Sequence, residues 1–193
     1  MTIGLLGGSF NPAHSGHVGI SLAALQRLGL DQVWWLVSPQ NPLKPAAGMA
    51  AYAARVAHAR SLASDKRIWV STLEQELGTR YTADTLAALA KRCPGVRFVW
   101  LMGADNLASI HRWQRWRTIF RTLPIAVLAR PDYAHAALAA PAARCFHAAR
   151  VVESAARTLP RTAPPAWVFL HTRLDPTSAT ALRNRGQGLG STE

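Results

Sequence analysis

Cysteine, lysine and long apolar runs are scarce in this chain of 193 residues. Two isolated cysteines, Cys93 and Cys145, do not indicate a disulfide scaffold. No apolar run reaches the length of a membrane span, and residues 1–4 lack the basic region of a signal peptide. The sequence also lacks the dinucleotide fingerprint GxGxxG and the Walker pattern. These absences predict a cytoplasmic protein that does not bind a membrane.

Composition indicates an ordered, globular protein, and its net charge alone does not decide what it binds. Hydrophobic residues make up 49% of the chain and charged residues 17%, enough for one domain with a sizeable core. There are 22 Lys and Arg against 10 Asp and Glu, for a net charge of +12. A positive field attracts nucleic acid and small polyphosphates alike. However, the basic residues are dispersed, and no RNA-binding, zinc-finger or clustered-basic motif is present, so we expect no nucleic-acid partner.

The alternation of apolar strands and helices predicts an α/β, single-domain, Rossmann-like fold. We expect a doubly wound, mainly parallel sheet with helices on both faces. The domain covers residues 1–185, and residues 186–193 form a flexible C-terminal tail. Strands are expected at 3–6, 32–37, 68–70, 96–102, 124–129 and 168–170. Helices are expected at 14–28, 49–63 and 134–140, with Thr82 and Ser178 near the starts of two more; little else is assigned within 134–165.

The stretch Gly7–His17, with the sequence GGSFNPAHSGH, organises the rest of the chain. It joins the first strand to the first helix, where glycines let the backbone approach a ligand. His14 and His17 are three residues apart at the helix start, so they share one face. Donors and the helix dipole there suit an anion with several phosphate oxygens. Half of a zinc site is the alternative, but the isolated cysteines supply no further ligand pair.

Other candidate residues follow the ends of predicted strands, where ligands bind in open parallel sheets. Lys44 lies in a proline-rich loop after the second strand and is read as a phosphate ligand or an ordinary solvated lysine. Asp105 accepts from ribose hydroxyls or caps a helix. Ser178, Thr180 and Arg183 form a second anion site or simply a capped helix.

Two further segments have competing interpretations. Thr82 is expected to be the N-cap of a helix, with Asp84 in its first turn. Trp113 and Trp116, spaced i and i+3, are expected to share a helix face. Such a pair either belongs to the core or stacks on a ring of a charged ligand.

Taken together, these segments resemble the bacterial nicotinate-nucleotide adenylyltransferases of the HxGH nucleotidyltransferase superfamily. The resemblance covers residues 1 to about 185. It is carried by Gly7–His17, 39–44, RYTADTL at 80–86, GAD at 103–105, WQRW at 113–116, RPDY at 130–133 and SATALR at 178–183. The first and last also occur in other adenylyl- and cytidylyltransferases. The YTxDTL, GAD and WxxW segments indicate the pyridine-nucleotide branch.

The resemblance implies an enzyme of NAD biosynthesis. It would join nicotinate mononucleotide to the AMP part of ATP, giving deamido-NAD and pyrophosphate, with Mg²⁺ brought by the ATP phosphates and no protein metal site. The implied catalytic residues are His14, His17, Lys44 and Arg183. The implied ATP-binding residues are Gly7, Gly8, Ser9, Phe10, His14, His17, Gly103, Asp105, Ser178, Thr180 and Arg183. The implied nicotinate nucleotide-binding residues are Tyr81, Thr82, Trp113 and Arg130.

The sequence departs from the family pattern at four positions. Asn11 stands where Asp is frequent, Leu43 where His is frequent, Thr177 where an apolar residue is usual and Ala179 where Ser is frequent. Separately, another HxGH transferase, acting on phosphopantetheine or a nicotinamide nucleotide, stays open as an alternative. The oligomeric state is also open, a homo-oligomer included.

Overall fold

The structure is a computed structural model that describes residues 1–39, 48–130, 133–171, 182–183 and 188–189. The strands are β1 (Thr2–Gly8), β2 (Gln32–Val37), β3 (Ile68–Ser71), β4 (Arg97–Gly103), β5 (Ile125–Leu128), β6 (Arg150–Val151) and β7 (Trp167–Leu170). The α-helices are α1 (Ser15–Leu28), α2 (Tyr52–Leu62), α3 (Leu73–Glu76), α4 (Thr82–Arg92), α5 (Ala104–Ser109), α6 (Trp116–Thr122), α7 (Ala134–Leu138) and α8 (Pro141–Cys145). The 3₁₀ helices are η1 (Ile110–Arg112), η2 (His147–Ala149) and η3 (Glu153–Arg161).

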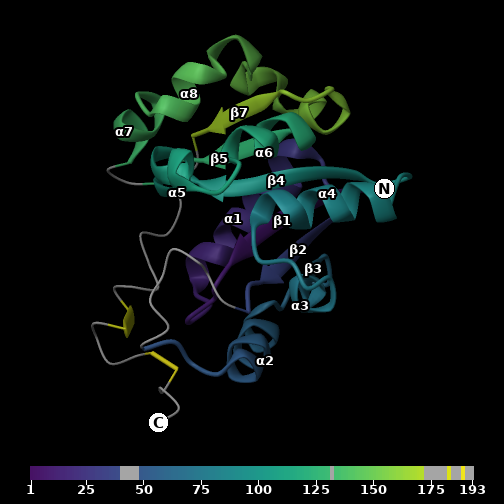
Figure 1. Ribbon diagram of the computed structural model, residues 1–193, viewed down its shortest axis with the longest axis vertical. Helices are drawn as coiled ribbons and strands as arrows, with labels where there is room; N and C mark the ends of the chain where they lie inside the picture. Colours follow the sequence, from purple (N-terminus) through teal and green to yellow (C-terminus); the bar gives the residue numbers. More distant parts are fainter. Residues whose placement is uncertain (40–47, 131–132, 172–181, 184–187, 190–193) are drawn as a thin grey trace.

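The described strands form one seven-stranded sheet in the order β3-β2-β1-β4-β5-β7-β6. Every pairing in it is parallel. The chain winds outward from β1 to β3 and then returns to the other side of β1 with β4 (Figure 1). The predicted doubly wound parallel sheet is thus confirmed.

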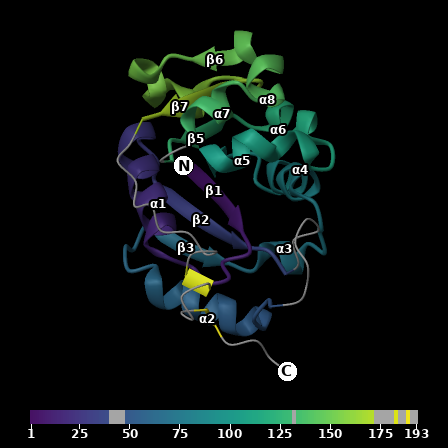
Figure 2. The ribbon, with the colours of Figure 1, turned by 90° about the vertical axis from the view of Figure 1, so that its left-hand side faces the viewer.

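Two apolar layers cover the sheet. On one face α4 to α8 pack against side chains of β1, β4, β5 and β7, with Trp100 and Phe120 among the buried residues. On the other face α1, α2 and η3 cover a second cluster that includes Trp35 and Leu101. Figure 2 shows α1 on one side of the sheet and α4 to α6 on the other. Both faces are buried, which explains why the strands read as near-continuous apolar runs.

Three local expectations need correction. Helix α4 begins at Thr82, so Tyr81 and not Thr82 is its N-cap. Trp113 and Trp116 do not share a helix face, because Trp113 is extended after η1 and Trp116 opens α6. Arg115 between them has a left-handed backbone (φ 53°), which breaks the helical repeat. The segment 134–165 also holds α8, η2, β6 and η3, whose short elements carry little periodic signal.

Within the described ranges, no helix is both long and apolar enough to span a membrane.

The expected start of the first helix at His14 and its end before Gly29 agree with α1, since Gly29 has the left-handed backbone (φ 66°) of a residue after a helix.

Candidate active site

The predicted site lies where the strand order reverses, at the carboxyl ends of β1 and β4. These two strands are neighbours, and the predicted nucleotide-binding residues follow both of them. In Figure 1 the arrow of β4 points to the edge where α5 begins. Such a switch point leaves a crevice at the sheet edge, because the connections leave in opposite directions.

Packing requires a glycine at Gly7, the first of the pair at the end of β1. A Cβ at Gly7 would collide with the ring of Trp100, which is 2% exposed and covers β1 from β4. A Cβ at Gly8 would lie 3.4 Å from the Phe10 ring. The requirement for glycine at Gly7 therefore comes from a neighbouring strand, although the sequence pattern is read as a phosphate loop.

Phe10 is the strained residue of the loop. Its φ of 46° lies in the left-handed region, which costs a non-glycine residue on the order of 1–3 kcal/mol. The ring is 1% exposed and stacks on Trp35 of β2 at 5.1 Å between centroids. Burial of two aromatic rings offsets the backbone strain and fixes the turn from β1 to α1.

The two histidines lie together at the N-terminus of α1. Their ring centroids are 3.9 Å apart, and His17 also contacts the Phe10 ring at 4.6 Å. The backbone N–H of His14 donates to Nδ1 of His17 at 3.2 Å. A neutral His17 that accepts at Nδ1 carries its proton on Nε2, which makes Nε2–H the ring donor for a ligand. This geometry suits donation to a phosphate oxygen at the positive end of the helix dipole.

Two consecutive buried hydrogen bonds connect the His17 backbone in α1 to β2. Trp35 Nε1 donates to Ser21 Oγ at 2.8 Å, and Ser21 Oγ donates to the His17 carbonyl at 2.8 Å. Both side chains are fully buried. Sequence reasoning placed Trp35 in a strand but did not connect it to the site, since the contact depends on how α1 packs on the sheet.

Arg183 comes to the same loop from the far end of the sequence. Its Nη1 donates to the Asn11 carbonyl at 2.6 Å, across 172 positions of the chain. The Asn11 side chain donates to the Gly48 carbonyl at 3.1 Å and accepts from the Ala50 N–H at 3.2 Å. The structure thus brings Arg183 to the histidine loop. Lys44, Ser178 and Thr180, which the sequence assigns to the same site, lie outside the described residues.

Asp105 is held in place after β4. Its carboxylate accepts from Arg130 Nη1 at 3.0 Å. A Cβ at Gly103 would collide with the same carboxylate, so glycine there lets Asp105 fold back over the strand end. Two residues that were predicted for different substrates, Asp105 and Arg130, therefore form one ion pair.

The residues predicted to bind the nicotinate nucleotide lie on segments that an ion pair connects. Tyr81 and Thr82 lie at the start of α4, and Trp113 lies in the segment before α6. Asp84, in the first turn of α4, pairs with Arg115. Trp116 packs edge-on against Phe120 and Phe146 and belongs to the core.

Glu74, a buried carboxyl that lies between the end of β2 and α4, is not singled out by the sequence. Glu74 of α3 is 8% exposed and bonds to the side chains of Ser38, after β2, and Thr85, in α4. Burial raises the pKa of the Glu74 carboxyl to about 7, although both hydrogen bonds act to lower it. Ser38 in turn donates its N–H to the Gly8 carbonyl at 2.9 Å, so this network reaches the loop after β1.

The donor set near the site is poor in carboxylates. In the part of the chain that the structure describes, no group of three or more His, Cys, Asp or Glu could hold a metal ion. Asp105 is engaged by Arg130. Mg²⁺ is commonly held by substrate phosphates with one or two carboxylates, so these residues fit an ion that arrives on a triphosphate.

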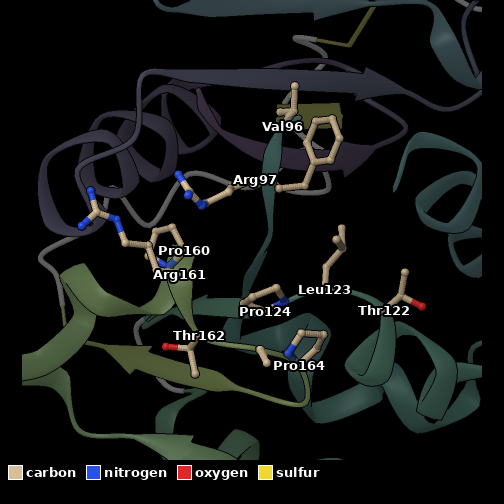
Figure 3. Close-up of a pocket in the computed structure, with 11 residues that line it drawn as sticks. Val96, Arg97, Thr122, Leu123, Pro124, Pro160, Arg161, Thr162 and Pro164 are labelled. Carbon is tan, nitrogen blue, oxygen red and sulfur yellow. The ribbon is translucent and has the colours of Figure 1, made fainter. Parts of the chain in front are cut away.

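A separate surface cavity of about 300 Å³ lies at the amino ends of β4 and β5. Figure 3 shows Arg97 and Arg161 on one side of it and Thr122 and Leu123 on the other. Among its described lining residues none belongs to the predicted site, which is at the opposite edge of the sheet.

Comparison with known proteins gives a family match and close relatives. Residues 5–185 match the cytidylyltransferase-like family. A Cereibacter sphaeroides protein described as a probable nicotinate-nucleotide adenylyltransferase is 53% identical over 193 residues, covering 100% of both chains. A Bradyrhizobium protein with the same description is 55% identical over 184 residues, covering 95% of this chain and 96% of its own.

Solved structures share the fold at low identity. The Plasmodium falciparum nicotinic acid mononucleotide adenylyltransferase complexed with NaAD superimposes with a TM-score of 0.70 at 14% identity. The match covers 95% of this chain and 82% of that one. At this identity the likeness establishes the common fold and does not carry residue roles.

Proposed function

The chain belongs to the cytidylyltransferase-like family and, within it, to the nicotinate-nucleotide adenylyltransferases, and from this we propose that it transfers AMP from ATP to nicotinate mononucleotide. The products would be deamido-NAD and pyrophosphate. The P. falciparum enzyme of the same fold was solved with NaAD, the dinucleotide that this reaction would yield. We also place the enzyme in the cytoplasm, as the sequence predicts.

One observation carries the proposed mechanism: Arg183 bonds to the carbonyl of Asn11, in the same loop that leads to His17 in the first turn of α1. A phosphate oxygen of the acceptor would attack the α-phosphorus of ATP in line. A new P–O bond forms there, the bond to the β-phosphate breaks, and pyrophosphate leaves with the electron pair. His17 Nε2–H and the Arg183 guanidinium would neutralise charge on the transferring and leaving groups.

The remaining residues bind and orient the substrates. His14, the loop at residues 7–10, Lys44, Ser178, Thr180 and Arg183 would bind the triphosphate. Gly103 and Asp105 would contact adenosine. Mg²⁺ bound to the phosphates would offset their negative charge. The backbone at Tyr81 and Thr82 would read the nicotinate carboxylate, with Trp113 stacked on the pyridine ring and Arg130 close to the nucleotide.

Pyrophosphate release tests this proposal directly. The assay uses ATP and Mg²⁺ with either nicotinate mononucleotide or nicotinamide mononucleotide as acceptor. Strong turnover with the acid and weak turnover with the amide is the expected result. Equal turnover would overturn the carboxylate reading at Tyr81 and Thr82. Turnover with neither, in a folded sample that binds ATP, would redirect the search to acceptors such as phosphopantetheine.

A further inference from the structure

We infer that Arg55 is a positioning residue for the ATP triphosphate: its buried guanidinium ties the loop after β1 to the chain leaving β2 and leaves a net positive charge beneath the phosphate site. Arg55 lies in the first turn of α2 and is 1% exposed. The inference rests on the proposed function only in taking the loop at Gly7–His17 to be the phosphate site.

Arg55 bonds to four backbone carbonyls from three segments. Nη1 donates to Ser9 O at 2.5 Å and to Ser38 O at 2.8 Å. Nη2 donates to Pro39 O at 2.8 Å, and Nε donates to Ala50 O at 3.0 Å. Ser9 belongs to the histidine loop, and Ser38 and Pro39 lead from β2 towards Lys44. One planar group therefore sets the spacing of the segments that carry predicted phosphate ligands.

Arg55 carries a buried charge whose described hydrogen-bond partners are backbone carbonyls. No salt bridge joins Arg55 to Asp or Glu among the residues that the structure describes. Its guanidinium lies 5.3 Å from the centroid of the Tyr52 ring, and burial lowers the pKa of Arg55. Carbonyl oxygens supply only partial negative charge. A triphosphate bound on the other side of the Ser9 loop would supply the full counter-charge in a region of low dielectric.

Asn11 forms a second tie to the same region, which makes the geometry specific. Its side chain bonds to Gly48 and Ala50, and Ala50 O is also a partner of Arg55. The loop is thus held at Ser9 by Arg55 and at Asn11 by its own side chain. Lysine could keep the charge at position 55, but it has three donors on one nitrogen and cannot reproduce a fork that reaches four carbonyls.

The test compares Arg55→Lys with Arg55→Met, and uses Arg60→Lys and Arg60→Met as matched controls. Arg60 lies on the same helix and is exposed. We measure kcat and the KM for each substrate, together with Tm. For Arg55→Lys we expect kcat/KM for ATP to fall by about 100-fold, with a higher KM for ATP, because loop misplacement of this kind costs about that much. The KM for nicotinate mononucleotide should stay within about threefold, and both Arg60 variants should match the parent.

Direct binding separates this inference from the proposed function. Calorimetry with a non-hydrolysable ATP analogue needs no acceptor, so it reads the role of Arg55 whichever acceptor is used. A folded Arg55→Lys variant with at least tenfold weaker analogue binding supports the inference. Unchanged analogue affinity overturns it, as does an equal rise in KM for both substrates. If Arg55→Met does not fold, Arg55→Lys decides alone.

Discussion

At the scale of single residues, His17 carries the strongest chemical prediction. Replacement by alanine removes the Nε2–H donor together with the Nδ1 acceptor of the His14 N–H. We expect His17→Ala to lower kcat by on the order of 10²–10³-fold, the usual cost of losing one preorganised donor to a developing charge. Steady-state pyrophosphate release at saturating substrates measures it. His135→Ala, on the exposed side of α7, is the control. A near-normal kcat for His17→Ala would remove His17 from the mechanism.

Glu74 gives a prediction for stability against pH. Its carboxyl has a pKa of 4.5 when unfolded and about 7 in the fold, so the folded state holds the extra proton between these values. The stabilisation is complete below pH 4.5 and is lost as the pH rises through 7. A shift of this size corresponds to roughly 3 kcal/mol.

Replacing Glu74 with glutamine removes the titrating proton. Glu74→Gln should therefore remove the fall in unfolding free energy between pH 4.5 and about 7. The difference in unfolding free energy between the variant and the parent should be larger, in favour of the variant, at pH 8 than at pH 5. Urea denaturation at both pH values measures the difference. Glu76→Gln removes an exposed carboxylate of the same helix and should change little. A parallel decline in the parent and in Glu74→Gln would show that Glu74 does not titrate in this window.

At the scale of elements, the Asp84–Arg115 pair couples α4 to α6. Both side chains are substantially exposed, so the pair should contribute no more than about 1 kcal/mol to stability. It does, however, link the first turn of α4, next to Tyr81 and Thr82, to the segment that carries Trp113. We therefore expect Asp84→Asn to raise the KM for nicotinate mononucleotide several-fold, with the KM for ATP and the Tm nearly unchanged.

A charge reversal tests the same pair. Asp84→Arg with Arg115→Asp restores the attraction, and aspartate tolerates the left-handed backbone at position 115 better than most residues. The double variant should recover part of the KM for nicotinate mononucleotide that Asp84→Arg alone loses. Additive losses in the double variant would show that the two residues act independently.

At the scale of the whole molecule, the site joins segments from both ends of the chain. Ligand binding should therefore stabilise the entire domain by mass action. A non-hydrolysable ATP analogue at 100 times its Kd should add about 2.7 kcal/mol, which is roughly 5–11 °C in Tm for a domain of this size. Arg183→Ala should lose much of this gain at the same analogue concentration. A full gain in Arg183→Ala, measured by differential scanning calorimetry, would contradict a role for Arg183 in holding ATP.

The sequence by itself determined most of the strands and the helix that carries the two histidines. Apolar runs marked β1, β2 and β4, because strands buried on both faces need continuous hydrophobicity. The glycine turn followed by His14 and His17 marked the N-terminus of α1. These signals are local, so they survive without knowledge of the fold. Two predictions were wrong. Helix α4 begins one residue earlier than expected, so that Tyr81 and not Thr82 is its N-cap, and the left-handed backbone of Arg115 keeps Trp113 and Trp116 from sharing a helix face.

Only the tertiary structure decided which distant residues support the site. The contact of Arg183 with Asn11 spans 172 positions, and the bond of Arg55 to Ser9 spans 46. Glu74 acquires its raised pKa from burial between Ser38 and Thr85, which lie on separate segments. Nothing in the local pattern around Arg55 or Glu74 distinguishes them from surface charges. Their roles arise because packing α2 and α3 beside the sheet removes them from water and leaves carbonyls and hydroxyls as partners.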